Sequence, residues 1–448
     1  MIRYTKIFIT ILLAFIAFGA QSQSTATSSS PYSRYGLGDI SNTGIMPQNI
    51  AMGGIGTAIN NVGWLSNANP LNPASYGFIN LTTIDIGIYS SALILQQTGQ
   101  STQANENFRL SHIAFGIPVT HNSALSFGLQ PYSQLGYNYK QNLPRGFGTS
   151  SPADTNSTNY VYQGEGGLSK AYIGYGITIL KHLSIGANVS YIFGDLKQSQ
   201  STEIPGLFGT LNSTTEEDNT IGGFNYDYGV QYAFDLTSTK HLTLGYSASV
   251  GSKLNTQSSY IVSQFTFDSN GVANLAADSV INQQGVLGKV QLPRINHYGI
   301  SYVEDGKFLV GADLTTGNWS NLTIDGVNQG LLNSKTFNIG GQYTPDINAI
   351  NSYWSKVDYR LGGMYDQSYM NVANPTGGGS TNIKSYALTF GLGMPLRPSF
   401  TNSFYKINVA VEVGQRGTLA NGLVKEDYFN LHLGFLLNDK WFLRRKLD

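Results

Sequence analysis

The sequence predicts an all-β protein: a transmembrane antiparallel β-barrel of about fourteen strands with an N-terminal hatch or plug segment. Three observations predict this fold. Only 12% of the residues are charged, Lys+Arg and Asp+Glu number 26 each, and the chain has 52 Gly, 28 Tyr and 22 Phe. Beyond the N-terminus there is no apolar run of the roughly 18 residues that a membrane helix needs. Apolar residues instead alternate with small or polar ones, which is the pattern of barrel strands.

The first residues predict export. Arg3 and Lys6 precede an apolar run from Ile7 to Phe18, and small residues follow at Ala20 and Ser22. We interpret residues 1–22 as a cleaved secretory signal peptide, because the run is too short for a convincing membrane span. The alternative is an uncleaved anchor helix. The chain has no Cys, which excludes disulfides, thiol chemistry and lipid attachment through Cys.

Residues 80–438 form the predicted barrel. Apolar side chains recur at every second position in segments that are separated by turn residues. These segments are residues 84–88, 113–119, 125–129, 173–179, 183–193, 224–234, 242–250, 298–302, 308–314, 336–343, 357–365, 386–394, 405–413 and 429–437. Residues 439–448, which contain the basic run Arg444–Lys446, are predicted to be a short periplasmic tail.

The connections between these segments alternate in length. Tight turns are predicted at 120–122, 181–182, 236–240 and 304–306, and long polar loops at 140–164, 198–220, 256–289 and 367–382. With both termini in the periplasm, the tight turns fall inside and the long loops outside, as in outer-membrane barrels. A soluble β-sandwich or propeller needs no such asymmetry and exposes more charge.

Ionisable residues on the opposite face of the strands are assigned to the lumen. Both signs occur, so we expect structural pairs inside a mostly filled barrel and not the charged constriction of an ion-selective pore. Lys170, His112, His297 and His432 share this face. The residues predicted to form the lumen charge pairs are Asp85, Asp227, Asp313, Asp358, Arg360, Glu412 and Arg416.

The sequence predicts no enzyme. It contains no G-x-S-x-G elbow, no H-E-x-x-H motif and no D-x-D-x-D-G calcium loop. We therefore predict no catalytic residues, no metal site and no cofactor. The balanced charge also argues against nucleic-acid binding, which needs a basic face.

Residues 23–79 do not alternate and are rich in Gly, Asn, Ser and Pro. Such a long irregular stretch predicts either a plug inside the lumen or a disordered periplasmic lead. A plug is physically reasonable because side chains alone do not fill the lumen of a barrel of about fourteen strands. Met46–Asn60 has enough apolar residues for a short helix broken by glycines.

Several motifs in order along the chain resemble FadL-like outer-membrane proteins of the Bacteroidota branch. At the N-terminal end these are PYSRYGLGD, AMGGIGTA and NPASYG. Further on they are GLQPYSQLGY (128–137), SIGANVSYIFG (184–194), the stretch from Leu292 through FLVGADL to Trp319, EVGQRGTL (412–419) and NDKWFLRRKLD. The resemblance covers nearly the whole chain after the signal peptide and implies a location in the outer membrane of a Gram-negative cell.

This resemblance implies passage of hydrophobic, fatty-acid-like small molecules, with the hatch as a gate and a sideways exit into the membrane. By motif, the hatch residues are Asn72, Pro73 and Ala74. The candidate lateral gate is Gln130, Pro131 and Tyr132, because Pro131 lacks the N–H of a ladder bond. The alternative is that Pro131 only ends a strand at the rim.

A second reading stays open. The chain also resembles PorV-type barrels, which implies a non-transporting subunit or shuttle of a multi-protein outer-membrane machine for secretion or outer-membrane assembly. A structural barrel or an ordinary porin is a third possibility. The expected partners are therefore outer-membrane lipid, a hydrophobic small-molecule ligand, or other outer-membrane or periplasmic proteins.

Overall fold

The computed structural model of the chain describes residues 30–40, 46–60, 65–143, 157–204, 207, 209–274, 278–396 and 403–440. The predicted signal peptide and residues 441–448 of the predicted tail lie outside the described residues. No helix in these ranges is both long and apolar enough to span a membrane. The short helices are η1 (Pro31–Arg34), α2 (Pro47–Ile50), η2 (Pro73–Phe78), η3 (Trp319–Asn321), η4 (Trp354–Lys356) and η5 (Ala420–Gly422).

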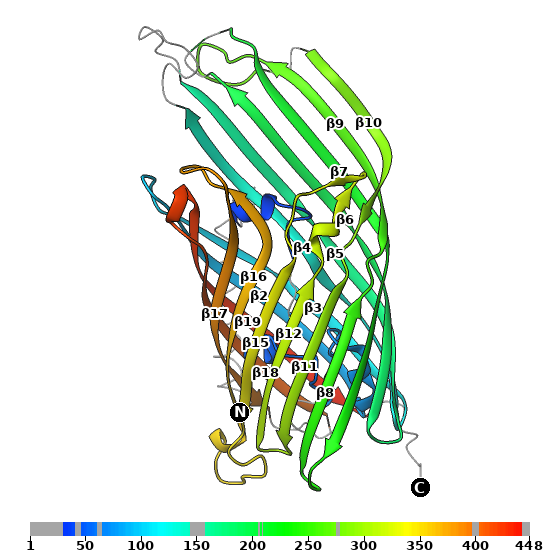
Figure 1. The fold of residues 1–448 in the computed structure, drawn as a ribbon. Helices are drawn as coiled ribbons and strands as arrows, with labels where there is room; N and C mark the ends of the chain where they lie inside the picture. Colours follow the sequence, from blue (N-terminus) through cyan, green and yellow to red (C-terminus); the bar gives the residue numbers. More distant parts are fainter. Residues whose placement is uncertain are drawn as a thin grey trace.

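Strands account for most of the described chain (Figure 1). They are β1 (Asp39–Ile40), β2 (Thr82–Gln97), β3 (Gln103–Thr120), β4 (Ser123–Leu143), β5 (Thr158–Ile179), β6 (Leu183–Glu203), β7 (Asn212–Asp235), β8 (Lys240–Ser249), β9 (Lys253–Phe265), β10 (Asp278–Gln291), β11 (Ile295–Glu304), β12 (Phe308–Gly317), β13 (Thr323–Ile324), β14 (Val327–Asn328), β15 (Ser334–Tyr343), β16 (Asp358–Ala373), β17 (Ser380–Pro395), β18 (Phe404–Gly417) and β19 (Val424–Asp439).

The strands close into an antiparallel ring with fourteen strand positions, which are here called staves. Two of the staves each consist of two strands. β8 and β9 both pair with β7 and together form one stave. β11 pairs with β8 and β10 pairs with β9, so β10 and β11 together form the next stave. The short strands β1, β13 and β14 lie outside this count. The ring closes where β19 pairs with β2, from Val424–Gln97 to Asp439–Thr82. The predicted all-β barrel of about fourteen strands is thus confirmed.

The alternation of side chains explains the ring. Along β6, Val189, Tyr191 and Phe193 are exposed, whereas Ser190 and Ile192 between them are buried. β17 repeats the pattern with exposed Leu388 and Phe390. An outward apolar face and a small or polar inward face are what a barrel in lipid requires.

The two ends of the barrel differ. The turn end carries the tight connections after Thr120, Ile179, Asp235 and Glu304. At the opposite loop end, β4–β7, β9 and β10 rise well above the other staves (Figure 1). β5 and β7 have 22 and 24 residues, whereas β8, β11, β12 and β15 have 10 each.

The long loops predicted from the sequence are therefore wrong over most of their described residues, while residues 144–156, 205–206, 208 and 275–277 of these stretches lie outside the described part of the chain. β4–β7, β9 and β10 continue as strands into the stretches 140–164, 198–220 and 256–289, and β16 and β17 continue into 367–382. In this tall wall many residues on both strand faces are Ser, Thr, Asn, Gln or Glu, so no apolar face marks the strands. Polar strands of this kind look like loops in a hydropathy pattern.

One edge of the tall wall is open. β10 pairs with β9 along its length, but on its other side the described residues pair only Val290 and Gln291, with β13. Four apolar side chains of this strand are exposed, and Leu287 is 82% exposed. They are Val280, Ile281, Val286 and Leu287. Two register shifts interrupt its pairing with β9, between Ser279 and Ile281 and between Gln283 and Val286.

Apolar side chains gather inside the ring at two heights. Toward the loop end, Leu37, Leu135, Trp319 and Tyr369 belong to one large buried cluster. Smaller clusters nearer the turn end form around residues 46–79, for example Met52, Ile55 and Ile59. The N-terminal segment (blue in Figure 1) supplies residues to all of these clusters and lies within the ring of strands.

Glycines in the wall let this segment approach the strands. A Cβ on Gly340 of β15 would lie 2.2 Å from the Met52 carbonyl oxygen, and one on Gly362 of β16 would lie 2.1 Å from the Gly53 nitrogen. Gly53 itself has φ +72°, a conformation that favours glycine. The neighbouring Gly363 has no atom closer than 3.6 Å to such a Cβ.

We expect Gly362→Ala to destabilise the folded barrel by about 1–3 kcal/mol, because the added methyl group overlaps the backbone at Gly53. Gly363→Ala is the matched control, since the same change on the adjacent residue meets only open contacts. Thermal unfolding in detergent measures both. Equal melting temperatures for the two variants would contradict the close approach at Gly53.

Candidate functional site: the N-terminal segment, the β3–β4 seam and the polar cavity

The inner segment (residues 46–60 and 65–79) is built from short turns. Pro47 starts α2, and Pro73 starts η2, a position where proline needs no N–H. The Asn72 side chain caps η2 by accepting a hydrogen bond from Ala74 N at 3.1 Å. Its amide also donates to the Thr57 carbonyl oxygen at 2.6 Å. The predicted hatch residues Asn72, Pro73 and Ala74 are all buried, and Asn72 joins the two halves of the inner segment.

Side chains of the wall bind the backbone of the inner segment. Asp313 Oδ2 accepts hydrogen bonds from Gly56 N and Thr57 N, both at 2.8 Å. Gln231 donates to the Thr57 carbonyl oxygen at 2.9 Å, and Ser301 donates to that of Ala58 at 2.7 Å. These three residues come from β12, β7 and β11, so several staves hold one short turn.

The same kind of contact continues around the ring. Thr389 of β17 accepts from Gly53 N at 2.8 Å, and Asn338 of β15 donates to the Gly53 carbonyl oxygen. Gln48 donates to Asp85 of β2 at 3.1 Å, and Asn438 of β19 accepts from Ser66 N at 2.8 Å. The inner segment is thus hydrogen-bonded to staves on all sides of the lumen.

Most of the predicted lumen charges lie in buried or partly buried pairs. Asp85 is 3.2 Å from His112, Asp227 is 2.6 Å from Lys170, and Glu412 is 3.6 Å from His432. Asp358 contacts Arg360 at 2.8 Å and Lys406 at 2.7 Å. Such pairs satisfy charges that would be costly if left alone.

Asp313 corrects one prediction. Within the described part of the chain it has no ionic partner, and its carboxylate is satisfied by the two backbone N–H groups of the inner segment. A carboxylate that accepts two backbone hydrogen bonds gains charge-assisted contacts without a cation. Asp313 is therefore an anchor of the inner segment and not a member of a charge pair.

The hydrogen-bonded pairing between β3 and β4 is incomplete, and this junction is here called the seam. The two strands pair from Thr120–Ser123 to Ile113–Leu129, and the described residues give no further pair toward the loop end. Ser111 is an extra residue of β3 against β2, and Tyr132 is an extra residue of β4 against β5. Bulges bend strands, so each strand bends beside the point where their pairing stops.

The predicted gate residues lie directly beyond the last pair of the seam. Gln130 and Pro131 stay paired with Lys170 and Ser169 of β5, on the far side of β4. Tyr132 packs against the large apolar cluster of the loop end. Pro131 has no N–H to offer a strand on either side.

A polar cavity of about 240 Å³ opens beside the seam. Its lining includes Arg109 of β3 and Gln134 of β4, one from each side of the seam. Arg109 lies over the Tyr89 ring, 4.6 Å from its centre. Glu412 and Arg416 of β18 and Glu426 of β19 also line it, so this part of the lumen is charged and hydrogen-bonding.

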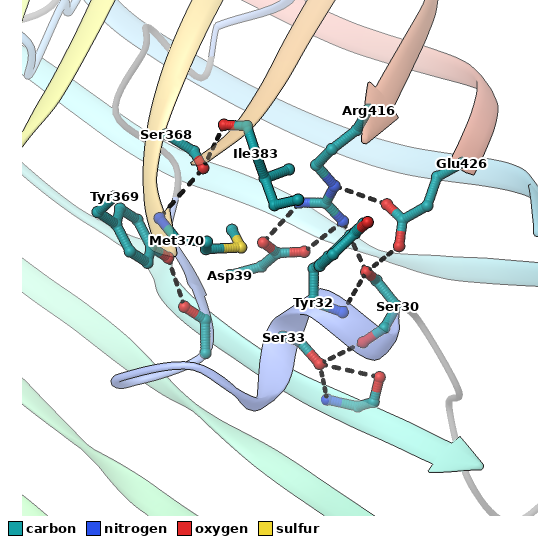
Figure 2. Close-up of polar contacts among 12 residues, drawn as sticks. Ser30, Tyr32, Ser33, Asp39, Ser368, Tyr369, Met370, Ile383, Arg416 and Glu426 are labelled. Carbon is teal, nitrogen blue, oxygen red and sulfur yellow. Dashed lines mark hydrogen bonds and ion pairs between the residues drawn. The ribbon is translucent and has the colours of Figure 1, made fainter. Parts of the chain in front are cut away.

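Residues 30–40, here called the strap, cross the lumen at the level of the cavity (Figure 2). Arg416 of β18 donates to both carboxylate oxygens of Asp39, at 2.7 and 3.0 Å. It also donates to Glu426 of β19 at 2.6 Å and to Ser30 at 2.8 Å. One guanidinium therefore joins both ends of the strap to the wall.

Tyr32 adds a further contact between the strap and the wall. Its hydroxyl donates to the Val424 carbonyl oxygen. Burial, and then the Glu426 carboxylate, raise the pKa of Tyr32 above its ordinary value. The hydroxyl consequently stays protonated and keeps donating at any physiological pH.

Sequence reasoning identified Arg416 but missed its partners Asp39, Glu426 and Ser30. Asp39 lies in the PYSRYGLGD motif, far along the chain from Arg416, so no spacing rule connects the two. The described residues contain no group of three or more His, Asp or Glu placed to hold a metal ion.

We expect Asp313→Ala to weaken the inner segment by about 2–4 kcal/mol, because two buried N–H groups lose their acceptor. The measurement is the rate of proteolysis within residues 46–79 of the folded barrel, which should rise. Asp346→Ala, at an exposed carboxylate, is the control and should leave the rate unchanged. An unchanged rate in Asp313→Ala would contradict the anchoring role.

Comparison with solved structures gives FadL-type barrels. The toluene transporter TodX of Pseudomonas putida has a TM-score of 0.55 at 14% identity and covers 89% of this chain and 99% of its own. The toluene transporter TbuX of Ralstonia pickettii scores 0.54 at 14% identity, covering 88% and 98%. A FadL homologue of Pseudomonas aeruginosa scores 0.52 at 14% identity, covering 89% and 98%.

At these identities the likeness shows the fold, and it confirms the FadL-like resemblance drawn from the sequence motifs. A search of curated proteins gives no match. A family model described as BamG matches residues 1–448, the whole length of the sequence. The chain therefore belongs to the BamG family and has the barrel fold of FadL-type outer-membrane proteins.

Proposed function

We propose that this protein is an outer-membrane barrel that passes hydrophobic, fatty-acid-like small molecules sideways into the membrane. The observation that best supports this function is the seam, where the β3–β4 pairing ends at Ile113–Leu129 beside two bulges. An interrupted ladder between two neighbouring strands is costly for a barrel in lipid, so we infer that this interruption has a function. The tight-turn end faces the periplasm and the tall wall faces the cell exterior.

In this proposal residues 23–79 act as the hatch, ahead of the barrel at 80–438 and the tail at 439–448. The anchoring of residues 46–79 by side chains from all around the ring supports a blocked axial route. A sideways exit suits an apolar solute, which gains free energy by entering hydrocarbon and not the aqueous periplasm. The FadL-type fold of the toluene transporters TodX and TbuX supports the same role.

Gln130, Pro131 and Tyr132 form the gate in this proposal. Pro131→Ala restores an N–H beside the seam, and we expect it to reduce uptake of a radiolabelled long-chain fatty acid by about tenfold in cells that depend on this barrel. Pro118→Ala is the control, because Pro118 pairs with Ala124 in the closed part of the same two strands. Equal uptake by parent and Pro131→Ala would remove the gate from the proposal.

A subunit of a multi-protein outer-membrane machine is the second candidate. The open β10 edge with its exposed apolar side chains favours it, because an extended segment of a partner protein can add to such an edge. The polar lining of the cavity and the family name BamG, which suggests outer-membrane assembly, support it as well.

Purification in mild detergent separates the two candidates. Transport predicts an isolated barrel that carries lipid-like molecules. The machine predicts partner proteins in fixed stoichiometry, which are lost when charges replace Val286 and Leu287 on the β10 edge. Retention of the same partners by that double variant would exclude the β10 edge as their binding surface.

A further inference from the structure

The strap and the inner segment are held in different ways. The inner segment is bound by staves on every side of the ring, whereas the strap is bound at β4, at β18 and β19, and at β16 through the Tyr369 hydroxyl, which donates to the Gly38 carbonyl oxygen at 2.8 Å. The two segments can therefore move independently, as far as their contacts with the wall are concerned.

On the β4 side, the strap takes the place of a missing strand. β1 pairs antiparallel with β4 through Asp39–Gln134 and Ile40–Ser133. Ser30 N donates to the Gly136 carbonyl oxygen at 3.0 Å. The Ser33 hydroxyl accepts from Gly136 N at 3.1 Å and donates to its carbonyl oxygen at 3.0 Å. The strap thus supplies the hydrogen bonds that β3 does not make along this part of β4.

At β18 and β19, Arg416 makes most of the polar contacts that hold the strap, next to the hydroxyl hydrogen bond from Tyr32 to the Val424 carbonyl oxygen. Figure 2 shows the Arg416 guanidinium between Asp39 and Glu426, with Ser30 on the same group. A planar guanidinium can bind a carboxylate with two parallel hydrogen bonds and still use its third nitrogen, which an ammonium cannot do. Without Asp39, Arg416 still has Glu426 as its ion partner, so the wall keeps its own pair when the strap leaves.

We propose that the strap is a releasable closure of the β3–β4 seam and that the Arg416–Asp39 ion pair is its latch. Breaking the pair weakens the hold on the strap, so β1 leaves β4 more readily and the seam opens, while the inner segment stays anchored through Asp313. The barrel then has two closures in series, one at the seam and one across the lumen. The role of the strap as a gate rests on the proposed transport function, whereas its release does not.

Two further observations fit this role. Gly36 and Gly38 have φ of +65° and +93°, and a Cβ on Gly38 would lie 2.5 Å from the Gln134 carbonyl oxygen. The strap thus turns tightly against the edge that it covers. The latch also lines the polar cavity, since Asp39, Arg416 and Glu426 all face it, so a polar group that enters the cavity can compete for Arg416.

The absence of Cys in the natural chain makes the test direct. Ser133→Cys places one thiol at a buried position opposite Ile40, where the Ser133 hydroxyl has no hydrogen-bond partner among the described residues. The rate of maleimide labelling of the folded barrel in detergent then reports release of the strap. We expect Asp39→Asn and Arg416→Lys in this background to label about tenfold faster than the parent, because each breaks charge-assisted hydrogen bonds of the latch.

Asp427→Asn is the matched control, because Asp427 pairs with Lys425 at 2.8 Å on β19 without touching the strap. It should label at the parent rate. Arg416→Lys keeps the buried positive charge, so it guards against a misfolded Asp39→Asn barrel. If Asp39→Asn and Arg416→Lys are both labelled by maleimide at the parent rate, the Arg416–Asp39 ion pair is not the latch.

A reversible disulfide between the strap and β4 tests the role of the strap as a gate. Ile40→Cys combined with Ser133→Cys joins the strap to β4 when oxidised, and we expect fatty-acid uptake to fall at least about tenfold and to return on reduction. Uptake that is equal in the oxidised and reduced forms would overturn the gate. If the parent barrel takes up no fatty acid, the proposed function fails, and the labelling rates still decide the latch.

Discussion

Every stave of this barrel must satisfy its backbone hydrogen bonds against a neighbour, because the surrounding lipid offers no donors or acceptors. Most junctions among the described residues do so through long ladders, among them the closing pair of β19 and β2, while the edge of β10 stays open in the tall wall. The junction between β3 and β4 stops at Ile113–Leu129. The bulges, the polar cavity and the strap all lie around that interruption, and the strap completes the edge of β4 from inside.

The barrel could be predicted from the sequence because lipid imposes a simple pattern. Residues such as Val189, Tyr191 and Phe193 alternate with small or polar ones, and all fourteen segments proved to be staves. The tall wall could not be predicted, since strands with polar residues on both faces carry no such alternation. Pro131, which was singled out for its missing N–H, lies two residues beyond the last β3–β4 pair at Leu129. The strap gave no comparable signal in the sequence.

Contacts between residues that lie far apart in the sequence could not be predicted either. Asp313 looked like one half of a charge pair, yet its partners are two backbone N–H groups of Gly56 and Thr57. Arg416 was assigned to the lumen from the sequence, whereas its partner Asp39 lies 377 positions away in the chain. Only the ring brings such residues together, and nothing in local composition encodes the pairing.

The closing pair of β19 and β2 also fixes the order of assembly. The inner segment immediately precedes β2 in the chain and lies within the ring, in contact with β19 through Asn438. Glycines such as Gly340 and Gly362 leave it no spare room against the wall. A finished barrel cannot easily be threaded by a segment that fits so closely. The N-terminal residues must therefore wait inside a still open sheet until the last strand reaches the first.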